Sequence, residues 1–451
     1  MKTDEQILAA ALEAASDTRS LTVEPGARRL AARVFDAHFG SARAVVVADG
    51  NTFQAAGRDV VDALGLRCGE PFVFGPHVHA ESGCVAELEA ALLRVDAIPV
   101  VVGSGTLNDL TKLASHRLNR PYMVVATAAS VDGYTAYGAS ITHRGSKQTF
   151  ECPAPRAVIA DLDVIAAAPA GMNASGYADL LAKAAAGADW MLADAAGEEA
   201  IDAPAWEAVQ SRLRAWVGDP RGVARGEPDS LRHLVYGLMM TGFAMQALRS
   251  SRPASGAEHQ FSHLWDMQHH EHRGAAPSHG FKVGIGTLAS LALHDECLRC
   301  DFVQLDIEDA VRRWPSLGEL ETRIARTLGS GELAANALAE SRAKYIAPDR
   351  LRRQLTVLSG AWAEVRGRIE NHLPRFAEAR DMLRAAGCPF EPEEIGISRE
   401  RLRASYQQAW FIRRRYTVLD FAWRAGFAEQ ALSGIFGRGG PWPTAAQEGA
   451  G

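Results

Sequence analysis

The first third of the chain alternates short apolar runs with stretches of helical character, and this alternation limits the folds open to it. Each run lacks polar alternation and is bounded by polar or glycine-containing turns, so each predicts a strand buried on both faces. Strands of this kind separated by helices favour a parallel sheet covered on both faces. The runs are "ARAVVVADGNT" (42–52), "PFVFG" (71–75), "AIPVVVG" (97–103), "PYMVVA" (121–126) and "RAVIADLDV" (156–164).

The strand patterns disappear after about residue 169. Stretches such as "GYADLLAKAAAGADWMLADAAG" and "DSLRHLVYGLMMTGFAMQAL" repeat apolar residues at helical spacing instead. We therefore expect an α/β domain with a parallel sheet over residues 1–168 and an all-helical domain over residues 169–436. The remaining stretch, 437–451, is rich in Gly, Pro and Ala and is expected to be disordered.

Composition narrows the class of protein. A chain of 451 residues favours two domains, and 47% hydrophobic with 23% charged residues is typical of a soluble globular protein. The net charge of −6 argues against a protein that coats nucleic acid, although it leaves a local basic patch open. No apolar run reaches the roughly 18 residues that a membrane span needs, and the charged N-terminus does not resemble a secretory signal. Six scattered cysteines do not indicate a disulfide scaffold, so we expect a cytoplasmic location.

Histidines concentrate in one segment. Residues 255–284 hold six of the fourteen histidines. His259 and His263 are four residues apart and share one face if the segment is helical. His279 follows on a separate turn. The spacing suits a divalent metal such as zinc, iron or nickel, but a solvated polar loop would carry the same residues.

Asp179, in "NASGYADLLAK", is a further candidate ligand. On spacing alone it could equally cap a helix N-terminus or pair with Lys183 one turn later. Combined with His259 and His279 it would give a mixed oxygen and nitrogen donor set that leaves coordination positions open.

Two further segments lie where predicted strands end, the place at which open α/β sheets bind ligands. In "VVVGSGTLNDLTK" a glycine turn runs into a helix, which favours a pyrophosphate at the helix N-terminus but also fits a tight capped turn. In "ATAASVDGYTAYGASIT", hydroxyl and carboxylate groups could reach a nicotinamide or a substrate, although Asp-Gly turns are common. The candidate residues are Gly103, Ser104, Gly105, Thr106, Leu107, Thr127, Ser130 and Asp132.

These motifs together resemble one family. "GSGTLNDLTK", "ATAASVDGYTAYGASIT", "GYADLLAK", "SRPASGAEHQFSH" and "HGFKVGIGTL" stand in the order found in the sn-glycerol-1-phosphate dehydrogenases, a branch of the iron-containing alcohol dehydrogenase and glycerol dehydrogenase superfamily. The resemblance covers roughly residues 40–300. It implies a Rossmann-like N-terminal domain and a helical C-terminal domain.

The resemblance also implies a role for individual residues. Asp179, His259 and His279 match the metal ligands, and His263 and Asp132 match positions that contact the substrate. The remaining matches concern the cofactor: Gly103, Ser104, Gly105, Thr106 and Leu107 for the pyrophosphate, Thr127 and Ser130 for the nicotinamide side, and Asp49 for the adenosine ribose. His269, His270 and His272 match no such position and are expected to be solvated in a connecting loop.

The implied activity is a metal-dependent, NAD(P)-linked oxidoreductase that interconverts dihydroxyacetone phosphate and sn-glycerol 1-phosphate or a similar phosphorylated pair. One divalent ion is expected, with zinc, nickel and iron all compatible. The alternatives are a glycerol or polyol dehydrogenase, a 3-dehydroquinate synthase-like lyase, and a non-catalytic nucleotide-binding relative. The expected partner is a small phosphorylated substrate, with no nucleic acid and no membrane span, and a homo-oligomer is left open.

Overall fold

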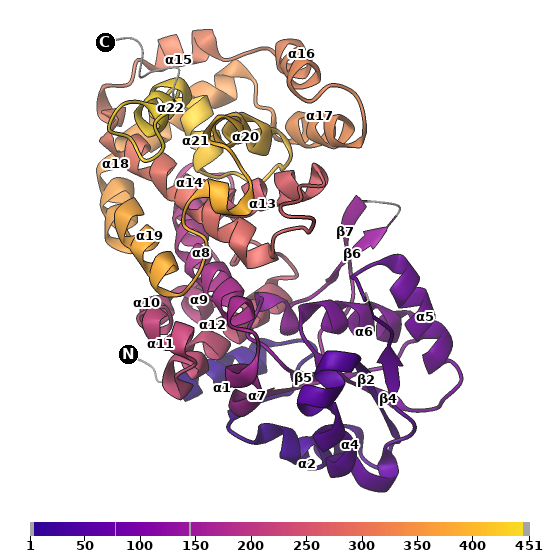
Figure 1. The fold of residues 1–451 in the computed structure, drawn as a ribbon. Coiled ribbons are helices and arrows are strands. Elements are labelled where there is room, and N and C mark those ends of the chain that lie inside the picture. The colour runs from indigo at the N-terminus through magenta and orange to yellow at the C-terminus, as the bar shows by residue number, and fades with distance from the viewer. Residues whose placement is uncertain (1–3, 77, 144–145, 445–451) are drawn as a thin grey trace. The chain divides into compact units, whose positions relative to one another are not determined.

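A parallel sheet forms where the apolar runs predict it. The computed structural model describes residues 4–76, 78–143 and 146–444. Among them, six strands pair in the order β1-β8-β5-β4-β2-β3, and every neighbouring pair is parallel (Figure 1). The strands are β1 (Ser20–Glu24), β2 (Ala44–Asp49), β3 (Phe72–Phe74), β4 (Ile98–Gly103), β5 (Met123–Ala126) and β8 (Ala157–Asp161). The predicted α/β fold class is confirmed.

Helices account for most of the remaining described chain, and after β8 no further strand follows within it, as predicted. In chain order they are α1 (Asp4–Ala14), α2 (Ala31–Phe39), α3 (Gly50–Thr52), α4 (Arg58–Leu64), α5 (Ser82–Leu92), α6 (Gly105–Arg117), α7 (Leu162–Ala167), α8 (Ala170–Ala195), α9 (Ala203–Gln210), α10 (Leu213–Trp216), α11 (Pro220–Arg225), α12 (Pro228–Leu248), α13 (Ala257–Met267), α14 (His279–Arg299), α15 (Ile307–Arg313), α16 (Leu317–Leu328), α17 (Glu332–Lys344), α18 (Pro348–His372), α19 (Phe376–Ala385), α20 (Arg399–Phe411), α21 (Val418–Arg424) and α22 (Ala428–Phe436).

The strands are buried on both faces. Alternate residues such as Val46 and Val102 pack into one core cluster with Phe35 of α2 and Val60 of α4. The residues between them, Val45 for example, point to the other face and are also buried, and α6 packs against β4. Because neither face meets water, the strands read as continuous apolar runs rather than as an alternating pattern.

The strand order creates a switch point between β2 and β4. From β2 the chain moves outward to β3, then returns to β4 on the other side of β2 and continues to β5. The connections that leave β2 and β4 therefore diverge, which opens a crevice at their carboxyl ends. Asp49 ends β2 and Gly103 ends β4, so two of the predicted cofactor positions lie at this crevice.

Three strands were missed by the sequence analysis. β1 has the half-polar sequence SLTVE, which lacks an apolar run, yet it pairs with β8 along its whole length. β6 (Ala139–His143) and β7 (Ser146–Phe150) form an antiparallel hairpin beyond the loop that follows β5. Such pairing depends on tertiary context, which outweighs local propensity in strands.

A buried lysine organises the loop between β5 and β6. Lys112 on α6 is fully buried, and its Nζ donates hydrogen bonds to the carbonyl oxygens of Gly133, Ala136 and Gly138 at 2.9–3.0 Å. The same Nζ lies 3.7 Å from Oδ1 of Asp109. An ammonium group has three donors, and here each has an acceptor, so the loop is held at three points.

Two helices approach the same loop closely. At Gly176 on α8, a Cβ atom would clash with the carbonyl oxygen of Ala129, and at Gly242 on α12 it would clash with Thr135 Oγ1. The absence of side chains lets both helix backbones lie directly against residues 129–135. The loop after β5 is therefore packed between α6, α8 and α12 rather than exposed to solvent.

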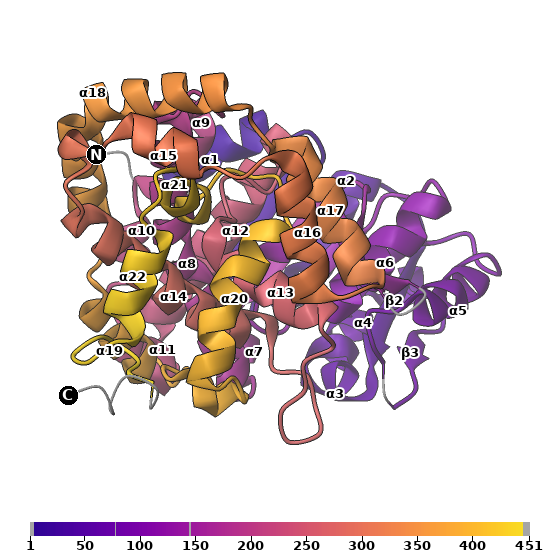
Figure 2. The same cartoon turned by 90° about the horizontal axis from the view of Figure 1, so that it is seen from above.

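Residues from Ala257 onward build a bundle of helices. α13 packs against α14 and α20, and α14 also packs against α21 and α22. α18 runs beside α15, and α16 beside α17, as Figure 2 shows from above. α18 is amphipathic: Leu351, Leu355, Leu358, Trp362 and Val365 are buried along one side, while its other side carries most of its charged residues.

Contacts divide the described chain into two compact units along a line that differs from the predicted one. The first unit runs to Leu180 and includes Pro204–Pro253 and Ala385–Gly387. The second comprises Leu181–Ala203, Ala254–Arg384 and the chain from Cys388 onward. Helical residues 204–253 thus cluster with the sheet, because α12 packs on the loop after β5. Which stretch binds the cofactor and which binds the metal and substrate stays a prediction.

The predicted disordered tail requires a correction for residues 437–444. Trp442 is fully buried, its ring lies 5.1 Å from that of Phe376, and its backbone N–H donates to the carbonyl of Ile435. The Gly and Pro content suggested disorder, but the buried indole anchors this stretch. Residues 445–451 lie outside the described residues. None of the described helices is long and apolar enough to cross a bilayer.

Candidate metal centre and active site

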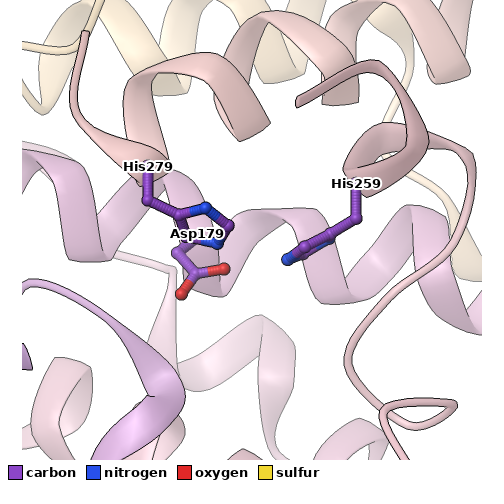
Figure 3. A group of neighbouring side chains, drawn as sticks. All are labelled: Asp179, His259 and His279. Carbon is purple, nitrogen blue, oxygen red and sulfur yellow. The ribbon is translucent and has the colours of Figure 1, made fainter. Parts of the chain in front are cut away.

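The three residues predicted as metal ligands converge. Asp179 of α8, His259 of α13 and His279 at the start of α14 each offer one donor atom, and these atoms lie within 4.8 Å of one another (Figure 3). The rings of His259 and His279 have centroids 5.3 Å apart. Asp179 is fully buried and His259 is 6% exposed. One carboxylate and two imidazoles suit zinc, iron or nickel, so the residues fit a divalent ion.

Asp179 is positioned by the loop that follows β5. Its Oδ2 accepts a hydrogen bond of 3.1 Å from the backbone N–H of Asp132. α8 begins at Ala170, so Asp179 lies more than two turns inside the helix. The alternative that Asp179 caps a helix N-terminus is therefore excluded. Gly176, one turn earlier, fixes the helix against the loop at Ala129, and both contacts set where the carboxylate lies.

His259 is oriented by its neighbour in sequence. Its Nδ1 lies 2.9 Å from Oε1 of Glu258, a fully buried carboxylate that also accepts the N–H of Gly256 at 2.6 Å. An ionised carboxylate only accepts hydrogen bonds, so Nδ1 carries the hydrogen and Nε2 keeps its lone pair. In Figure 3 the His259 ring points toward Asp179 and His279. Carboxylates behind metal-bound histidines commonly fix the ring and its tautomer in this way.

His263 lies next to the cluster but outside it. It follows His259 by one turn of α13, and the two ring centroids are 6.2 Å apart. It is half-buried, and the compact donor group of the described residues contains His259 and His279 without it. This position agrees with a histidine beside the metal rather than a ligand, and its role in contacting substrate stays a prediction.

Asp132 occupies a short 3₁₀ turn, Asp132–Tyr134, after β5. It is 7% exposed, and its backbone N–H is the donor to Asp179. One hydrogen bond thus links Asp179, a predicted metal ligand, to Asp132, a predicted substrate contact. Tyr134 in the same turn donates its hydroxyl to the carbonyl of Ala128 at 2.8 Å, which closes the loop on itself.

The predicted cofactor residues gather at the carboxyl edge of the sheet. Gly103 ends β4, and the N–H of Thr127, just after β5, donates to its carbonyl at 3.1 Å. Ser104 stands at the N-cap of α6 without a capping hydrogen bond from its side chain, and Gly105, Thr106 and Leu107 form the first turn. The free N–H groups of this turn can bind an anion.

Asp49 and Ser130 also lie at this edge. Asp49 caps α3: its Oδ1 accepts the N–H of Thr52 at 2.8 Å, in a capping box with that residue. Ser130 is half-buried, and its carbonyl accepts a hydrogen bond from Ser175. The structure places all the predicted cofactor residues at one edge, and their contacts with a cofactor stay predictions.

Packing alone requires a glycine at position 105, whether or not a cofactor binds there. A Cβ atom at this position would lie 2.8 Å from Cγ1 of Val131. The turn that opens α6 is thus packed against the loop after β5. A substitution at Gly105 alone would disturb this packing as well as any bound pyrophosphate.

The loop histidines require a correction. His270 is not solvated: it is 7% exposed, its Nε2 lies 2.6 Å from the carbonyl oxygen of Ile395, and Arg401 donates to its Nδ1 at 2.8 Å. Burial lowers the pKa of His270, which favours the neutral ring that this pair of contacts requires. His270 therefore anchors the loop between α13 and α14. His269 is exposed, as expected.

Two buried acids near the centre were missed from the sequence. Glu258 stands inside the quoted motif directly before His259, and this adjacency was the available signal. Asp189 is fully buried and accepts hydrogen bonds from the N–H groups of Ala257 and Val418 and from His294 at 2.7–3.1 Å. It ties the first residue of α13 in place, and no local pattern indicates that role.

Comparisons with known proteins identify the family. Residues 22–169 match the family model for iron-containing alcohol dehydrogenase. A glycerol-1-phosphate dehydrogenase (NAD(P)+) of Geobacillus stearothermophilus is 30% identical over 387 residues, which cover 84% of this chain and 86% of that relative. One from Halalkalibacterium halodurans is 33% identical over 270 residues, covering 56% of this chain and 65% of the relative's length.

The chain belongs to the glycerol-1-phosphate dehydrogenase family of iron-containing alcohol dehydrogenases. The resemblance inferred from the sequence motifs is thereby confirmed. The solved structure of a probable glycerol dehydrogenase from Sinorhizobium meliloti has a TM-score of 0.57 at 15% identity, covering 92% of this chain and 98% of that one. At 15% identity this likeness supports the fold alone, not the substrate or the roles of individual residues.

For the metal centre, we predict that His259→Ala and His279→Ala each lose the bound ion and nearly all turnover. Glu258→Ala should retain the ligands but weaken metal affinity by about 10- to 100-fold, because the His259 ring loses its support. Glu258→Gln, which can still accept a hydrogen bond from Nδ1, should recover much of that affinity. Metal content and competition with a chelator measure the effect. Full affinity in Glu258→Ala would contradict the orienting role.

For the cofactor loop, we predict that Gly105→Ala combined with Val131→Ala folds normally but binds a dinucleotide about tenfold more weakly. The second change removes the side chain that a Cβ at residue 105 would meet, so only the approach of the pyrophosphate is impeded. Val131→Ala alone is the matched control and should bind as the parent does. Calorimetry with NAD and NADP decides, and equal affinity in the double variant would place the pyrophosphate elsewhere.

Proposed function

We propose that this chain interconverts dihydroxyacetone phosphate and sn-glycerol 1-phosphate. The chain is an NAD(P)-linked oxidoreductase acting on a CH–OH group. The relatives that it matches over most of their length are named glycerol-1-phosphate dehydrogenases (NAD(P)+). The observation that carries the proposal is the convergence of Asp179, His259 and His279, since a non-catalytic relative would not need this donor set. The small phosphorylated substrate comes from the relatives' names, and a cytoplasmic location and a homo-oligomer stay predictions.

The metal, when bound, supplies a Lewis acid at the substrate carbonyl. The chain's own contribution is to hold the donor set in place. The N–H of Asp132 orients Asp179, and Glu258 orients His259, so both side chains are fixed before a substrate arrives. Preorganised groups lower a barrier because they need no reorganisation during the reaction.

The cofactor supplies the hydride, and the protein supplies its position. In this proposal the first turn of α6 binds the pyrophosphate and Thr127 with Ser130 orients the nicotinamide. For reduction of a carbonyl, the bound cofactor would supply the hydride and the chain would supply the proton that the alcohol oxygen needs; for oxidation, the chain would accept that proton.

His263 is the proposed group that moves this proton, directly or through one water. It lies on the same face of α13 as His259 and is half-buried, so solvent can still restore its proton. Asp132 would accept a hydrogen bond from the free hydroxyl of the substrate. Its backbone N–H donates to the Asp179 carboxylate, which keeps this residue beside the candidate metal site.

A substrate panel tests the proposed function. The metal-loaded protein is assayed by cofactor absorbance with dihydroxyacetone phosphate, dihydroxyacetone and glycerol, each with both cofactors. We expect kcat/KM for dihydroxyacetone phosphate to exceed that for dihydroxyacetone by at least about 100-fold, because charge-assisted hydrogen bonds to a phosphate are worth roughly 1.5–3 kcal/mol each. Equal or better rates with glycerol or dihydroxyacetone would favour the polyol dehydrogenase alternative.

We predict that His263→Ala keeps the metal and the cofactor and loses rate. Acid–base assistance is typically worth about 10²- to 10⁴-fold, so kcat should fall within that range. A fall of less than about tenfold would mean that His263 has no part in proton transfer. Loss of the metal from this variant would make His263 a ligand and contradict its assignment. Metal content and single-turnover rates separate the three outcomes.

A further inference from the structure

A cavity of about 790 Å³ lies among helices of the second compact unit. Its walls come from the second half of α14, the end of α18, the start of α19 and the loop after α22. The volume falls within the roughly 300–1,000 Å³ typical of small-molecule sites. Neither the metal ligands nor the predicted cofactor residues line it.

The lining of the cavity is unusually rich in arginine. Five guanidinium groups and three carboxylates face it, which leaves an excess of two positive charges in a chain whose net charge is −6. The arginines are Arg299, Arg366, Arg375, Arg380 and Arg438, and the acids are Asp295, Glu296 and Glu370. Such a balance favours an anionic ligand over a neutral or cationic one.

Three of the arginines are paired with the three acids. Arg366 lies 3.0 Å from Glu370, and Arg299 forms an ion pair with Glu296. Arg375 lies 3.3 Å from Asp295, which also accepts the N–H of Phe376 at the start of α19. These pairs hold the walls in place and account for all the negative charge of the lining.

The other two arginines have no acidic partner within the lining. Arg380 stacks over the ring of Phe376, its closest carboxylate contact is 3.7 Å to Glu391, and its buried Nε has no hydrogen-bond partner. Arg438 makes no ion pair within the described part of the chain. A buried guanidinium N–H without an acceptor costs free energy, and an anion in the cavity would supply one.

The segment that carries Arg438 is held at its far end. Trp442 is fully buried against Phe376, and its Nε1 donates to Glu391 at 3.2 Å. The N–H of Thr444 donates to the carbonyl of Phe436 at 3.0 Å. Arg438 and Arg380 therefore stand on supports that share Phe376 and Glu391, and a ligand would meet a largely formed site.

The cavity is remote from the metal centre. Asp295 is sixteen residues after His279 on the same helix, α14, which places it about 24 Å away along the helix axis at 1.5 Å per residue. A substrate bound at the metal centre cannot reach it. Since α14 begins with a metal ligand and its second half lines the cavity, one rigid element joins the two places.

We propose that this cavity is a second binding site, for a small phosphorylated anion, and that Arg380 and Arg438 are its principal contacts. Guanidinium groups recognise phosphate oxygens through paired, charge-assisted hydrogen bonds. The site is independent of the reaction proposed above.

Calorimetry with inorganic pyrophosphate tests this proposal on the metal-loaded full chain. The test variant is Arg380→Gln with Arg438→Gln, and the control is Arg326→Gln with Arg353→Gln, which removes the same charge from exposed positions outside the cavity. A third variant, Ala377→Glu, keeps every arginine and adds a carboxylate to the lining at an exposed position of α19. Thermal unfolding and turnover check that all three variants fold.

We expect the parent and the control to bind pyrophosphate at a site that weakens at least tenfold in both the double variant and Ala377→Glu. Parent-like stoichiometry and affinity in these two variants would overturn the proposal, because the anion would then bind elsewhere, for example at the cofactor loop. No binding to the parent would overturn it as well. An equal loss in the control would mean that net charge, not this cavity, attracts the anion.

Discussion

One hydrogen bond, from the backbone N–H of Asp132 to Oδ2 of Asp179, links the sheet to the metal centre. Asp132 lies on the loop that leaves β5, and Asp179 lies inside α8. The contact forms only because Gly176 lets α8 approach the carbonyl of Ala129, and because Lys112 holds the next part of the loop through three carbonyls. The backbone of this loop thus fixes the position of the Asp179 carboxylate, a predicted metal ligand.

The histidines are positioned by a different means. Glu258 is fully buried, fixes the His259 ring and ties itself to the N–H of Gly256. Asp189 anchors the first residue of α13 through Ala257. Buried carboxylates are costly unless they are hydrogen-bonded. Asp189 accepts three hydrogen bonds, whereas Glu258 makes its contacts through Oε1 and its buried Oε2 has no partner. Their presence in a helical bundle is better explained by the need to fix imidazole rings than by stability, because apolar residues of similar size would pack at lower cost.

The sequence predicted well where physical pattern and family motif coincide. β2, β4, β5 and β8 are continuous apolar runs because both faces of the sheet are covered, and the three predicted metal ligands, which stand in family motifs, do converge. It failed where long-range packing decides. SLTVE becomes β1 only by pairing with β8, and His270 is buried only because Ile395 and Arg401, far along the chain, contact it. Residues 437–444 are predicted to be disordered from their Gly and Pro content, but Trp442 is fully buried and holds them in place.

The account rests on an ion held by these three side chains, and a crystal structure of the zinc-loaded protein tests that most directly. Diffraction data collected on both sides of the zinc absorption edge locate the ion without reference to any assumed ligand. The account predicts one strong anomalous peak about 2.0–2.2 Å from an Asp179 carboxylate oxygen, from Nε2 of His259 and from a ring nitrogen of His279. A peak coordinated by His263 in place of either histidine, or no peak at this cluster, would contradict it.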